Sequence, residues 1–168
     1  MLVRMHTATN SSPPADRGPG VSFPPPLLFV GGLGIGVLLD LVLPLPAVIP
    51  DARWVVIVGF ALVAIGLGLM LAGIVTFKRR RTAVYPNRPA SLVVDTGIYA
   101  YTRNPMYSGL TIAYLGGVFL TGVLWVLILL PVVLTLLITQ VIRREERHLL
   151  ERFPEAYTAY CARVGRWF

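Results

Sequence analysis

Long uncharged apolar runs alternate along this chain with short basic segments. Residues 27–49 are apolar apart from Asp40 and are broken near their far end by Pro44 and Pro46. Residues 54–77 form a run of 24 residues with no charge. A third uncharged run covers residues 107–142. Because about 20 apolar residues carry a helix across a bilayer, the first two runs each predict one membrane-spanning helix.

The third run is too long for a single crossing. Its 36 residues would rise about 54 Å as one helix, against about 30 Å for the hydrocarbon core of a bilayer. We therefore expect the run to fold back on itself. The turn is expected among its small residues, Gly116, Gly117, Thr121 and Gly122. This gives spans at 105–120 and 122–142, the second bent at Pro131. The predicted fold is an all-α integral membrane protein with four transmembrane helices and a cytoplasmic carboxyl-terminal helical cap at residues 143–168.

The first 26 residues differ from the rest of the chain. They contain two proline-rich stretches and a Gly-Pro-Gly sequence, with almost no periodic apolar pattern. Such a segment cannot bury enough surface to offset its loss of entropy on folding. We expect residues 1–26 to be a disordered leader and residues 27–168 to form the membrane domain.

The composition agrees with a membrane protein and excludes an ordinary soluble domain. The chain of 168 residues is 55% apolar and 14% charged, whereas soluble domains carry about 25% charged residues. A single cysteine, Cys161, and two histidines, His6 and His148, leave little for a metal site. No metal is therefore expected.

The formal net charge of +7 could point to nucleic acid, but the distribution of charge indicates membrane topology instead. Positive charge gathers in short cytoplasmic loops. With four spans, fourteen of the fifteen Lys and Arg residues lie on one side and only Arg53 lies on the other. We therefore expect a multi-pass protein with both termini cytoplasmic, located in a bacterial inner membrane, and no nucleic-acid partner.

Small residues within the apolar runs predict close helix packing. Gly32 and Gly36 form a G-x-x-x-G face on the first span, and Gly68, Ala72 and Gly73 lie together on the second. Such faces let two helix backbones approach each other in a membrane. We expect both faces to contact neighbouring helices.

A first polar segment, residues 95–109, precedes the third apolar run. Its Thr-Gly pair predicts a turn, and Tyr99 and Tyr101 place two rings on one side of an extended stretch. Pro105 suits the first turn of a helix, whose free N–H groups could receive a carboxylate or a polar ligand. The alternative interpretation is an interfacial aromatic belt followed by an ordinary proline-started helix.

A second polar segment follows the last apolar run. On a helix its Leu149, Leu150 and Phe153 form an apolar stripe, which is typical of an amphipathic helix lying on a membrane. The adjacent Glu145 and Glu146 do not fit that role as well, because acidic groups where a span ends do not help the topology. These two residues are candidates for function.

Together the two segments resemble a family of integral membrane enzymes. The first reads T-G-x-Y-x-Y-x-R-N-P-M-Y-x-G from Thr96, and the second reads R-x-E-E-x-x-L-x-x-x-F-x-x-x-Y-x-x-Y from Arg143. This pair of motifs is similar to that of the isoprenylcysteine carboxyl methyltransferase and phospholipid methyltransferase group. The chain departs from the family pattern at Asn104, where histidine is usual, and at Pro154, where glycine is usual.

The resemblance implies S-adenosylmethionine as the methyl donor and cofactor, bound on the cytoplasmic side between the two motifs. Carried over position by position, it nominates as cofactor-binding residues Tyr99, Tyr101, Arg103, Asn104, Pro105, Tyr107, Glu145 and Glu146. A glutamate can accept hydrogen bonds from the donor's ammonium group, and Arg103 can hold its carboxylate. Aromatic rings can face the positively charged sulfonium.

The methyl acceptor is expected to be a small lipophilic molecule or a lipid that reaches the enzyme from the bilayer. If the acceptor is a carboxylate, Arg144 or Arg147 could orient it and no base is required. If it is a hydroxyl, thiol or amine, a base is required, and Glu146 or His148 is the candidate. The expected catalytic residues are therefore Glu146, Arg144 and His148.

Two other functions stay open at this point. Membrane sterol reductases share a similar R-x-P-x-Y signature and use NADPH, although they usually have many more spans. A membrane adaptor or small transporter without enzymatic activity could instead use the basic face to bind lipid headgroups. Binding of the methyl donor or of NADPH separates these possibilities.

Overall fold

The computed structural model describes residues 19–21, 23–46, 49–80 and 91–168. These residues form helices and connecting loops and contain no strand, so the all-α class is confirmed for them. Most of the expected leader, residues 1–18 and 22, lies outside the described residues. The helices in chain order are α1 (Pro26–Val42), α2 (Arg53–Arg79), the 3-10 helix η1 (Gly97–Ala100), α3 (Pro105–Thr121), α4 (Leu124–Leu137), the π-helical turn η2 (Ile138–Ile142), α5 (Arg143–Arg152) and α6 (Pro154–Arg163).

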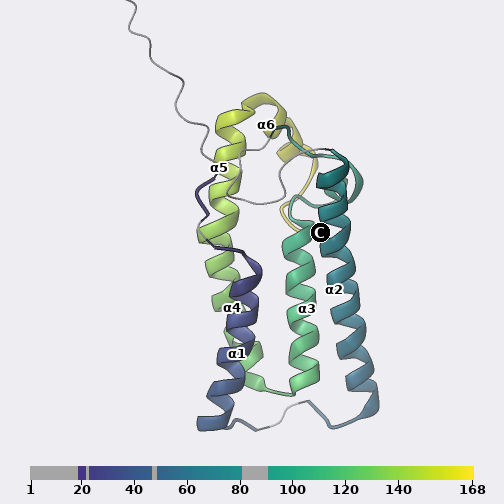
Figure 1. Ribbon diagram of the computed structural model, residues 1–168, viewed down its shortest axis with the longest axis vertical. Coiled ribbons are helices and arrows are strands. Elements are labelled where there is room, and N and C mark those ends of the chain that lie inside the picture. The colour runs from purple at the N-terminus through teal and green to yellow at the C-terminus, as the bar shows by residue number, and fades with distance from the viewer. Residues whose placement is uncertain (1–18, 22, 47–48, 81–90) are drawn as a thin grey trace, which may run out of the picture.

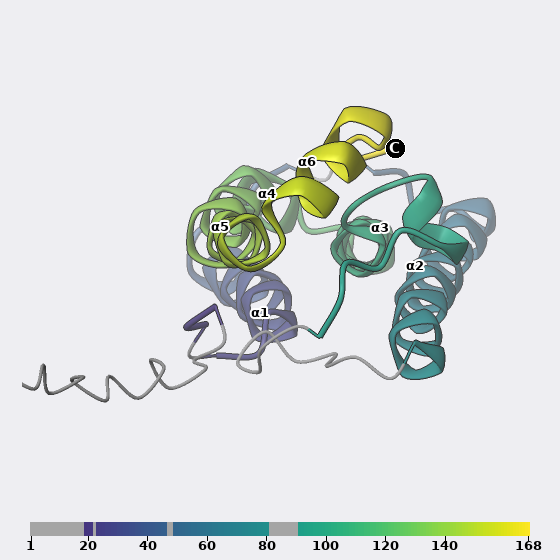
Figure 2. The same cartoon turned by 90° about the horizontal axis from the view of Figure 1, so that it is seen from above.

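Four long helices stand side by side and form an elongated bundle (Figure 1). α2 packs mainly on α3 and α1 mainly on α4, while α3 also contacts α1 and α4. α4, η2 and α5 continue as one helix that rises beyond the end of α3, and α6 folds back from its tip (Figures 1 and 2). The polar segments of the chain therefore meet at one end of the bundle.

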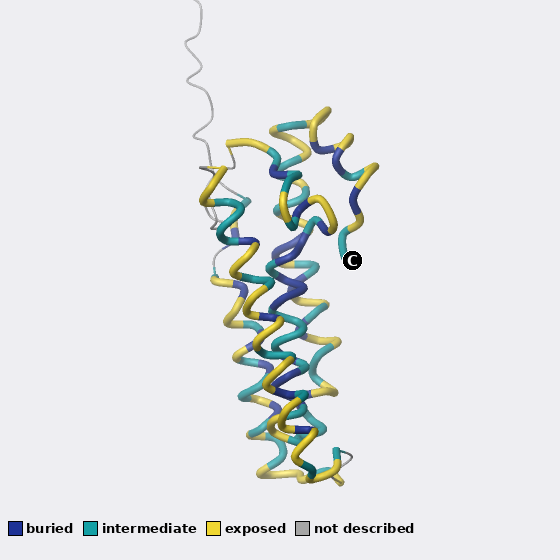
Figure 3. The backbone as a smooth tube through the Cα atoms, turned by 90° about the vertical axis from the view of Figure 1, so that its right-hand side faces the viewer, coloured by how far each residue is buried: buried dark blue, intermediate teal, exposed yellow. Residues whose placement is uncertain are grey.

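The outer faces of the bundle carry large apolar side chains along their length. Exposed positions recur on the helices from one end of the bundle to the other (Figure 3). On α1 and α2 they include Leu27, Val30, Leu38, Trp54, Ile57, Phe60, Ile65 and Leu71. Two helices, α2 and the continuous helix Leu124–Arg152, are long and apolar enough to cross a membrane, and α1 is a shorter apolar helix. A surface of this kind suits lipid, because soluble monomers rarely expose large apolar patches.

α1 ends at Val42, although the first expected span reached residue 49. Pro44 explains the early end, because a proline disfavours the helical conformation of the residue before it. The Asp40 carboxylate accepts a hydrogen bond from the Leu45 N–H at 3.4 Å. The Asp40 side chain therefore contacts the segment that follows α1.

α3 and α4 form a tight hairpin at Gly122. The φ of Gly122 is +67°, in the left-handed region that glycine adopts without steric cost. Its N–H donates to the Val118 carbonyl at 3.0 Å, which ends α3. α4 begins two residues later, at Leu124. The apolar run therefore folds back at one of the small residues that were expected to form the turn.

The helix after the hairpin changes its winding before it reaches the polar end. η2 is a π-helical turn, which takes up one more residue than an α-helical turn. Val141 and Ile142 in this turn are fully buried, whereas Arg143 and Arg144 just after it are exposed. η2 therefore sets which side chains of α5 face the bundle.

Glycines bring α2 and α3 into backbone contact. Gly59, Gly66 and Gly73 are buried and spaced seven residues apart along α2. A Cβ atom added to Gly66 would lie closer than 3.0 Å to the Gly109 carbonyl oxygen and to the Ala113 backbone nitrogen. No side chain larger than hydrogen fits there, so this contact fixes the two helices against each other.

The expected glycine faces are correct in part. Cβ atoms at Gly32 and Gly36 would collide with Val133 and Val126 of α4, so the face on α1 does pack closely. The prediction is wrong for Gly68, which has no neighbour within 4 Å. Gly68 lies two residues after Gly66, about 200° around the helix, and therefore points away from α3.

Candidate active site

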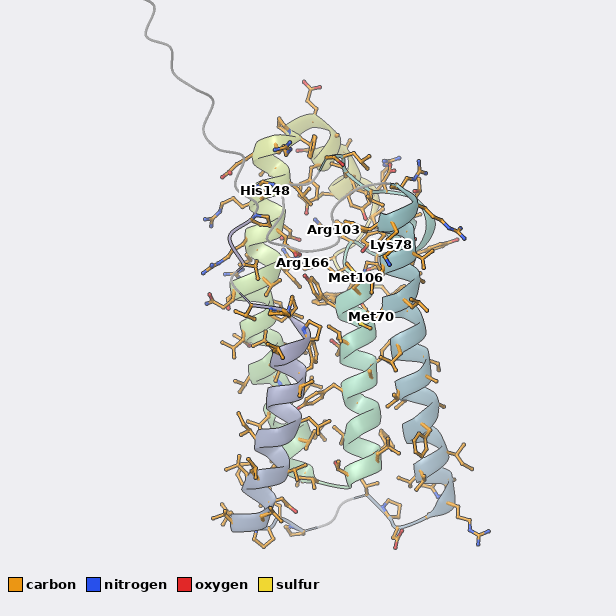
Figure 4. All side chains as sticks on the ribbon, in the orientation of Figure 1. Met70, Lys78, Arg103, Met106, His148 and Arg166 are labelled. Atoms are coloured by element: carbon orange, nitrogen blue, oxygen red, sulfur yellow. The ribbon has the colours of Figure 1, made fainter. Side chains whose placement is uncertain are left out.

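Three segments of the chain meet at the end of the bundle above α3. They are residues 95–104 before α3, which we call the motif loop, the α5–α6 pair, and residues 164–168 after α6, which we call the C-terminal strap. Figure 4 shows Arg103 of the motif loop and Arg166 of the strap at this end, with His148 farther out on α5. The polar chemistry of the chain is concentrated here.

The motif loop is held between α2 and α6. Gly97 has a φ of +63°, and a Cβ atom there would lie 3.2 Å from the Thr76 hydroxyl of α2. The buried Tyr99 ring packs against Phe77, with 4.9 Å between the ring centroids. The Tyr99 carbonyl accepts a hydrogen bond from the Tyr160 hydroxyl of α6 at 2.7 Å. The loop is therefore fixed by both of its neighbours.

The C-terminal strap is bound by three consecutive residues of the motif loop. The Arg103 backbone N–H donates to the Gly165 carbonyl at 2.9 Å. The Thr102 hydroxyl and the Asn104 side-chain amide both donate to the Arg166 carbonyl, at 3.1 and 3.2 Å. Thr102 is fully buried. Asn104, expected to contact the cofactor, here holds the strap in place.

Glu146 links the two motifs and the strap through ion pairs. Arg166 donates from Nε and Nη2 to the two carboxylate oxygens of Glu146, at 2.9 and 2.7 Å, which is a bidentate pair. Arg103 Nη1 lies 3.5 Å from the same carboxylate. It also donates to the Tyr157 hydroxyl at 3.4 Å and to the Cys161 sulfur at 2.6 Å. Arg103 and Glu146, 43 positions apart by their residue numbers, are therefore parts of one network.

A pocket of about 490 Å³ opens beside this network, between α5 and α6. We call it the α5–α6 pocket. Its lining residues are Arg103, Arg143, Glu146, Arg147, Leu150, Tyr157, Thr158 and Cys161. The described residues contain no group of three or more His, Cys, Asp or Glu that could hold a metal ion. The pocket is thus lined by three arginines, one carboxylate and an aromatic ring.

Glu145 lies next to Glu146 but in a different environment. It accepts a hydrogen bond from the Tyr107 hydroxyl of α3 at 2.8 Å. Burial raises the pKa of the Glu145 carboxyl from 4.5 to about 7, the Tyr107 hydrogen bond acts in the opposite direction, and the Glu146 charge adds to the rise. The two neighbouring acids therefore have different partners. Glu146 lies beside arginines, and Glu145 lies beside Tyr107.

We expect the stability of the protein to fall as the pH rises from about 4.5 to 7, and to level off above that range. In this window the folded protein keeps the Glu145 proton that the unfolded chain releases, so deprotonation favours unfolding. The measurement is the thermal unfolding midpoint in detergent between pH 4 and 8. Glu145→Gln should lose this part of the pH dependence. Parallel curves for the two proteins would contradict the pKa assigned to Glu145.

Three residues expected at the site lie apart from the network. Tyr101 is 71% exposed. Arg144 donates to the Gly20 carbonyl and to the Gln140 side chain, at 3.2 and 3.0 Å. His148 is half-buried, and its Nε2 has no hydrogen-bond partner among the described residues. None of the three lines the α5–α6 pocket. Of the residues expected to bind the cofactor, Arg103 and Glu146 line it, whereas Tyr99, Asn104, Pro105, Tyr107 and Glu145 do not.

Other residues of the site were missed by the sequence reasoning. From the sequence, Arg166 was expected only to mark the cytoplasmic side of the membrane. Its bidentate pair with Glu146 depends on the path of the strap. Arg143 and Leu150, in contrast, could have been found from spacing. They lie three before and four after Glu146, on the face of a helix that they share with Arg147.

Comparison with known protein families finds a match. A family model described as phospholipid methyltransferase matches residues 54–156, more than half of the chain. No curated protein and no solved structure matches. The matched range includes Arg103, Glu145 and Glu146, and it ends before the strap.

Proposed function

Because the chain belongs to the phospholipid methyltransferase family, we propose that it transfers a methyl group from S-adenosylmethionine to a lipophilic acceptor in the membrane. The observation that carries this proposal is the meeting of Arg103 and Glu146 at one pocket. Its volume of about 490 Å³ falls within the usual range of about 300–1,000 Å³ for small-molecule sites.

The residues of the α5–α6 pocket suit the charged parts of the donor. Glu146 accepts hydrogen bonds from its ammonium group, and Arg103, whose buried Nε has no partner among the described residues, binds its carboxylate. The Tyr157 ring faces the positive charge through a cation–π contact, a type of contact that contributes about 0.5–2 kcal/mol. When bound, S-adenosylmethionine supplies a methyl group activated on a sulfonium. The protein's part is to hold this group in line with the acceptor.

The proposed topology places the site at the cytoplasmic face. α1 to α4 form four spans, and α5, α6 and the strap form the cap that covers one end of the bundle (Figure 1). Lys78, Arg103 and Arg166 all lie toward this end (Figure 4), and positive charge marks the cytoplasmic side. The donor then reaches the pocket from the cytoplasm, while the acceptor arrives from the bilayer.

Of the arginines expected to orient an anionic acceptor, Arg147 is the better placed. It lines the α5–α6 pocket, whereas Arg144 bonds to the segment before α1. We therefore assign this role to Arg147. The exposed apolar faces of the helices make a lipid-soluble acceptor the natural partner, since such a molecule and the enzyme share the bilayer.

Calorimetry on the detergent-solubilised full chain tests the proposal. S-adenosylmethionine and S-adenosylhomocysteine, its demethylated product, are expected to bind, and Glu146→Gln is expected to weaken both at least tenfold. Glu151→Gln, an exposed acid on the same helix, is the matched control and should bind normally. Equal affinities of the two variants for these compounds would show that Glu146 does not take part in binding them. Binding of NADPH without either methyl-donor compound would favour the reductase alternative.

A further inference from the structure

The carboxylate of Glu146 lines the α5–α6 pocket, yet both of its oxygens already have a partner. Arg166 donates to them at 2.9 and 2.7 Å, and Arg103 Nη1 lies 3.5 Å from the same group. Arg103 lines the pocket and Arg166 does not. The guanidinium of the C-terminal strap therefore holds the pocket's acid from outside the pocket.

The charges around Glu146 do not favour the arrival of a further cation. One carboxylate faces two guanidinium groups, and Arg143 and Arg147 also line the pocket. The ammonium group of a bound donor would be a third positive charge on this acid, and like charges at such short range repel each other. The ammonium group therefore pairs with Glu146 most easily when it replaces one of the guanidinium groups.

Of the two guanidinium groups, that of Arg166 is the one that can leave. The side chain of Arg166 is 37% exposed, whereas that of Arg103 is 16% exposed. Arg103 also donates to Tyr157 and to Cys161, both of which line the pocket. Because an ion pair that is partly open to water costs less to break than a buried one, the Arg166 side chain can swing into solvent while Arg103 stays.

The backbone of the strap keeps this guanidinium within reach of Glu146. The Arg166 carbonyl accepts hydrogen bonds from the buried side chains of Thr102 and Asn104, and Trp167 packs against the apolar core. None of these contacts uses the guanidinium, so they persist when it swings out. A group that is anchored in this way competes with a free ligand through its high effective concentration.

We propose that Arg166 is a built-in competitor of the methyl donor. Its guanidinium occupies the position at Glu146 that the ammonium group of the donor takes, and it swings out when the donor binds. This inference rests on the proposed function and adds a regulatory device to it. The exchange replaces one cation by another, so Glu146 never becomes an unpaired charge in a largely buried place, which would be costly. The apparent affinity for the donor falls with the fraction of molecules in which Glu146 is free.

The experiment is calorimetry on the detergent-solubilised full chain with S-adenosylhomocysteine and with methylthioadenosine. Methylthioadenosine keeps the nucleoside and the thioether but has neither the ammonium nor the carboxylate group. Arg166→Met is expected to bind S-adenosylhomocysteine at least ~fivefold more tightly than the wild type, because the competing cation is gone; this corresponds to about 1 kcal/mol. Its affinity for methylthioadenosine should not change, since that ligand brings no cation to Glu146.

Two further variants serve as controls. Arg163→Met removes an exposed arginine that pairs with Asp95 and should leave both affinities as they are. Arg166→Lys keeps the charge and loses the bidentate fork, so its affinity for S-adenosylhomocysteine should lie between those of the wild type and Arg166→Met; it carries the test if the methionine variant does not fold. The thermal unfolding midpoint of ligand-free Arg166→Met should fall, because Glu146 loses a partner. Tighter binding by a less stable protein is not what general damage to the site would produce.

The other results overturn the inference. Weaker binding of S-adenosylhomocysteine by Arg166→Met would show that Arg166 prepares Glu146 for the donor, and unchanged binding would show that its guanidinium does not compete. Equal tightening for both ligands would show that Arg166 narrows the pocket and does not oppose the ammonium group. If neither the wild type nor Arg166→Met binds S-adenosylhomocysteine or S-adenosylmethionine, the proposed function itself is refuted.

Discussion

Replacing Arg103 with methionine is expected to weaken the binding of S-adenosylhomocysteine at least ~30-fold. In the proposed complex Arg103, whose side chain is only 16% exposed, pairs with the carboxylate of the ligand. Loss of one partner of a buried, hydrogen-bonded charge pair costs about 2–5 kcal/mol, and 2 kcal/mol corresponds to about 30-fold in affinity. Calorimetry on the purified variant measures the loss directly.

Arg163→Met is the matched control for Arg103→Met. Arg163 pairs with Asp95 between the same two regions of the chain, but the two side chains are 65% and 42% exposed. Exposed pairs contribute about 0–1 kcal/mol, so this variant should bind nearly as the wild type does. Arg103→Lys should fall between the two, because lysine keeps the charge and loses the planar fork. Similar losses in the methionine variants would mean that Arg103 acts only through the general charge of this face.

Replacing Gly66 with leucine should prevent the native packing of α2 on α3. The new side chain would meet the backbone of Gly109 and Ala113, which cannot move without separating the two helices. Overpacking a core costs about 1–3 kcal/mol and occasionally more, and contact with backbone places this case at the upper end. The thermal unfolding midpoint in detergent, together with the folded fraction on size-exclusion chromatography, reports the effect.

Gly68→Leu provides the comparison within the same helix. Gly68 has open space around it and faces away from α3. Leucine also favours a helix by about 1 kcal/mol over glycine, so the variant should be as stable as the wild type or slightly more stable. Equal destabilisation by the two substitutions would show that the packing of α2 on α3 differs from the one described.

The helical class of the fold could be predicted because it depends on the length of apolar runs. A run of 24 uncharged residues at 54–77 has few ways to satisfy its backbone other than a helix. The end of α1 at Val42 agrees with the break expected at Pro44, although the apolar run that set the expected span continues to residue 49. The face of α2 was predicted only in part, because Gly66 and Gly68 look alike in sequence and differ only in their direction around the helix.

The sequence predicted which types of residue form the candidate site, but it did not predict which of these residues contact one another. The two motifs pointed to Arg103 and Glu146, and these residues do lie 3.5 Å apart. The strap could not be foreseen, because Arg166 reaches Glu146 only after α6 has folded back toward the motif loop. The separation of Glu145 from Glu146 depends on the winding of the helix just before them, which no hydropathy pattern records.

The π-helical turn η2 contains one residue more than an α-helical turn. This extra residue determines which partners Glu145 and Glu146 each contact. If the same residues were wound as a plain α-helix, α5 would turn by about 100° around its axis. Arg144 would then occupy the position opposite Tyr107, and Glu145 would stand where Glu146 now meets two arginines. Conversely, deleting one residue within η2 would shorten the helix while leaving both acids in place. An insertion of one more residue in η2 would therefore change which side chain meets Tyr107 and which meets the two arginines, without altering a single side chain of the site.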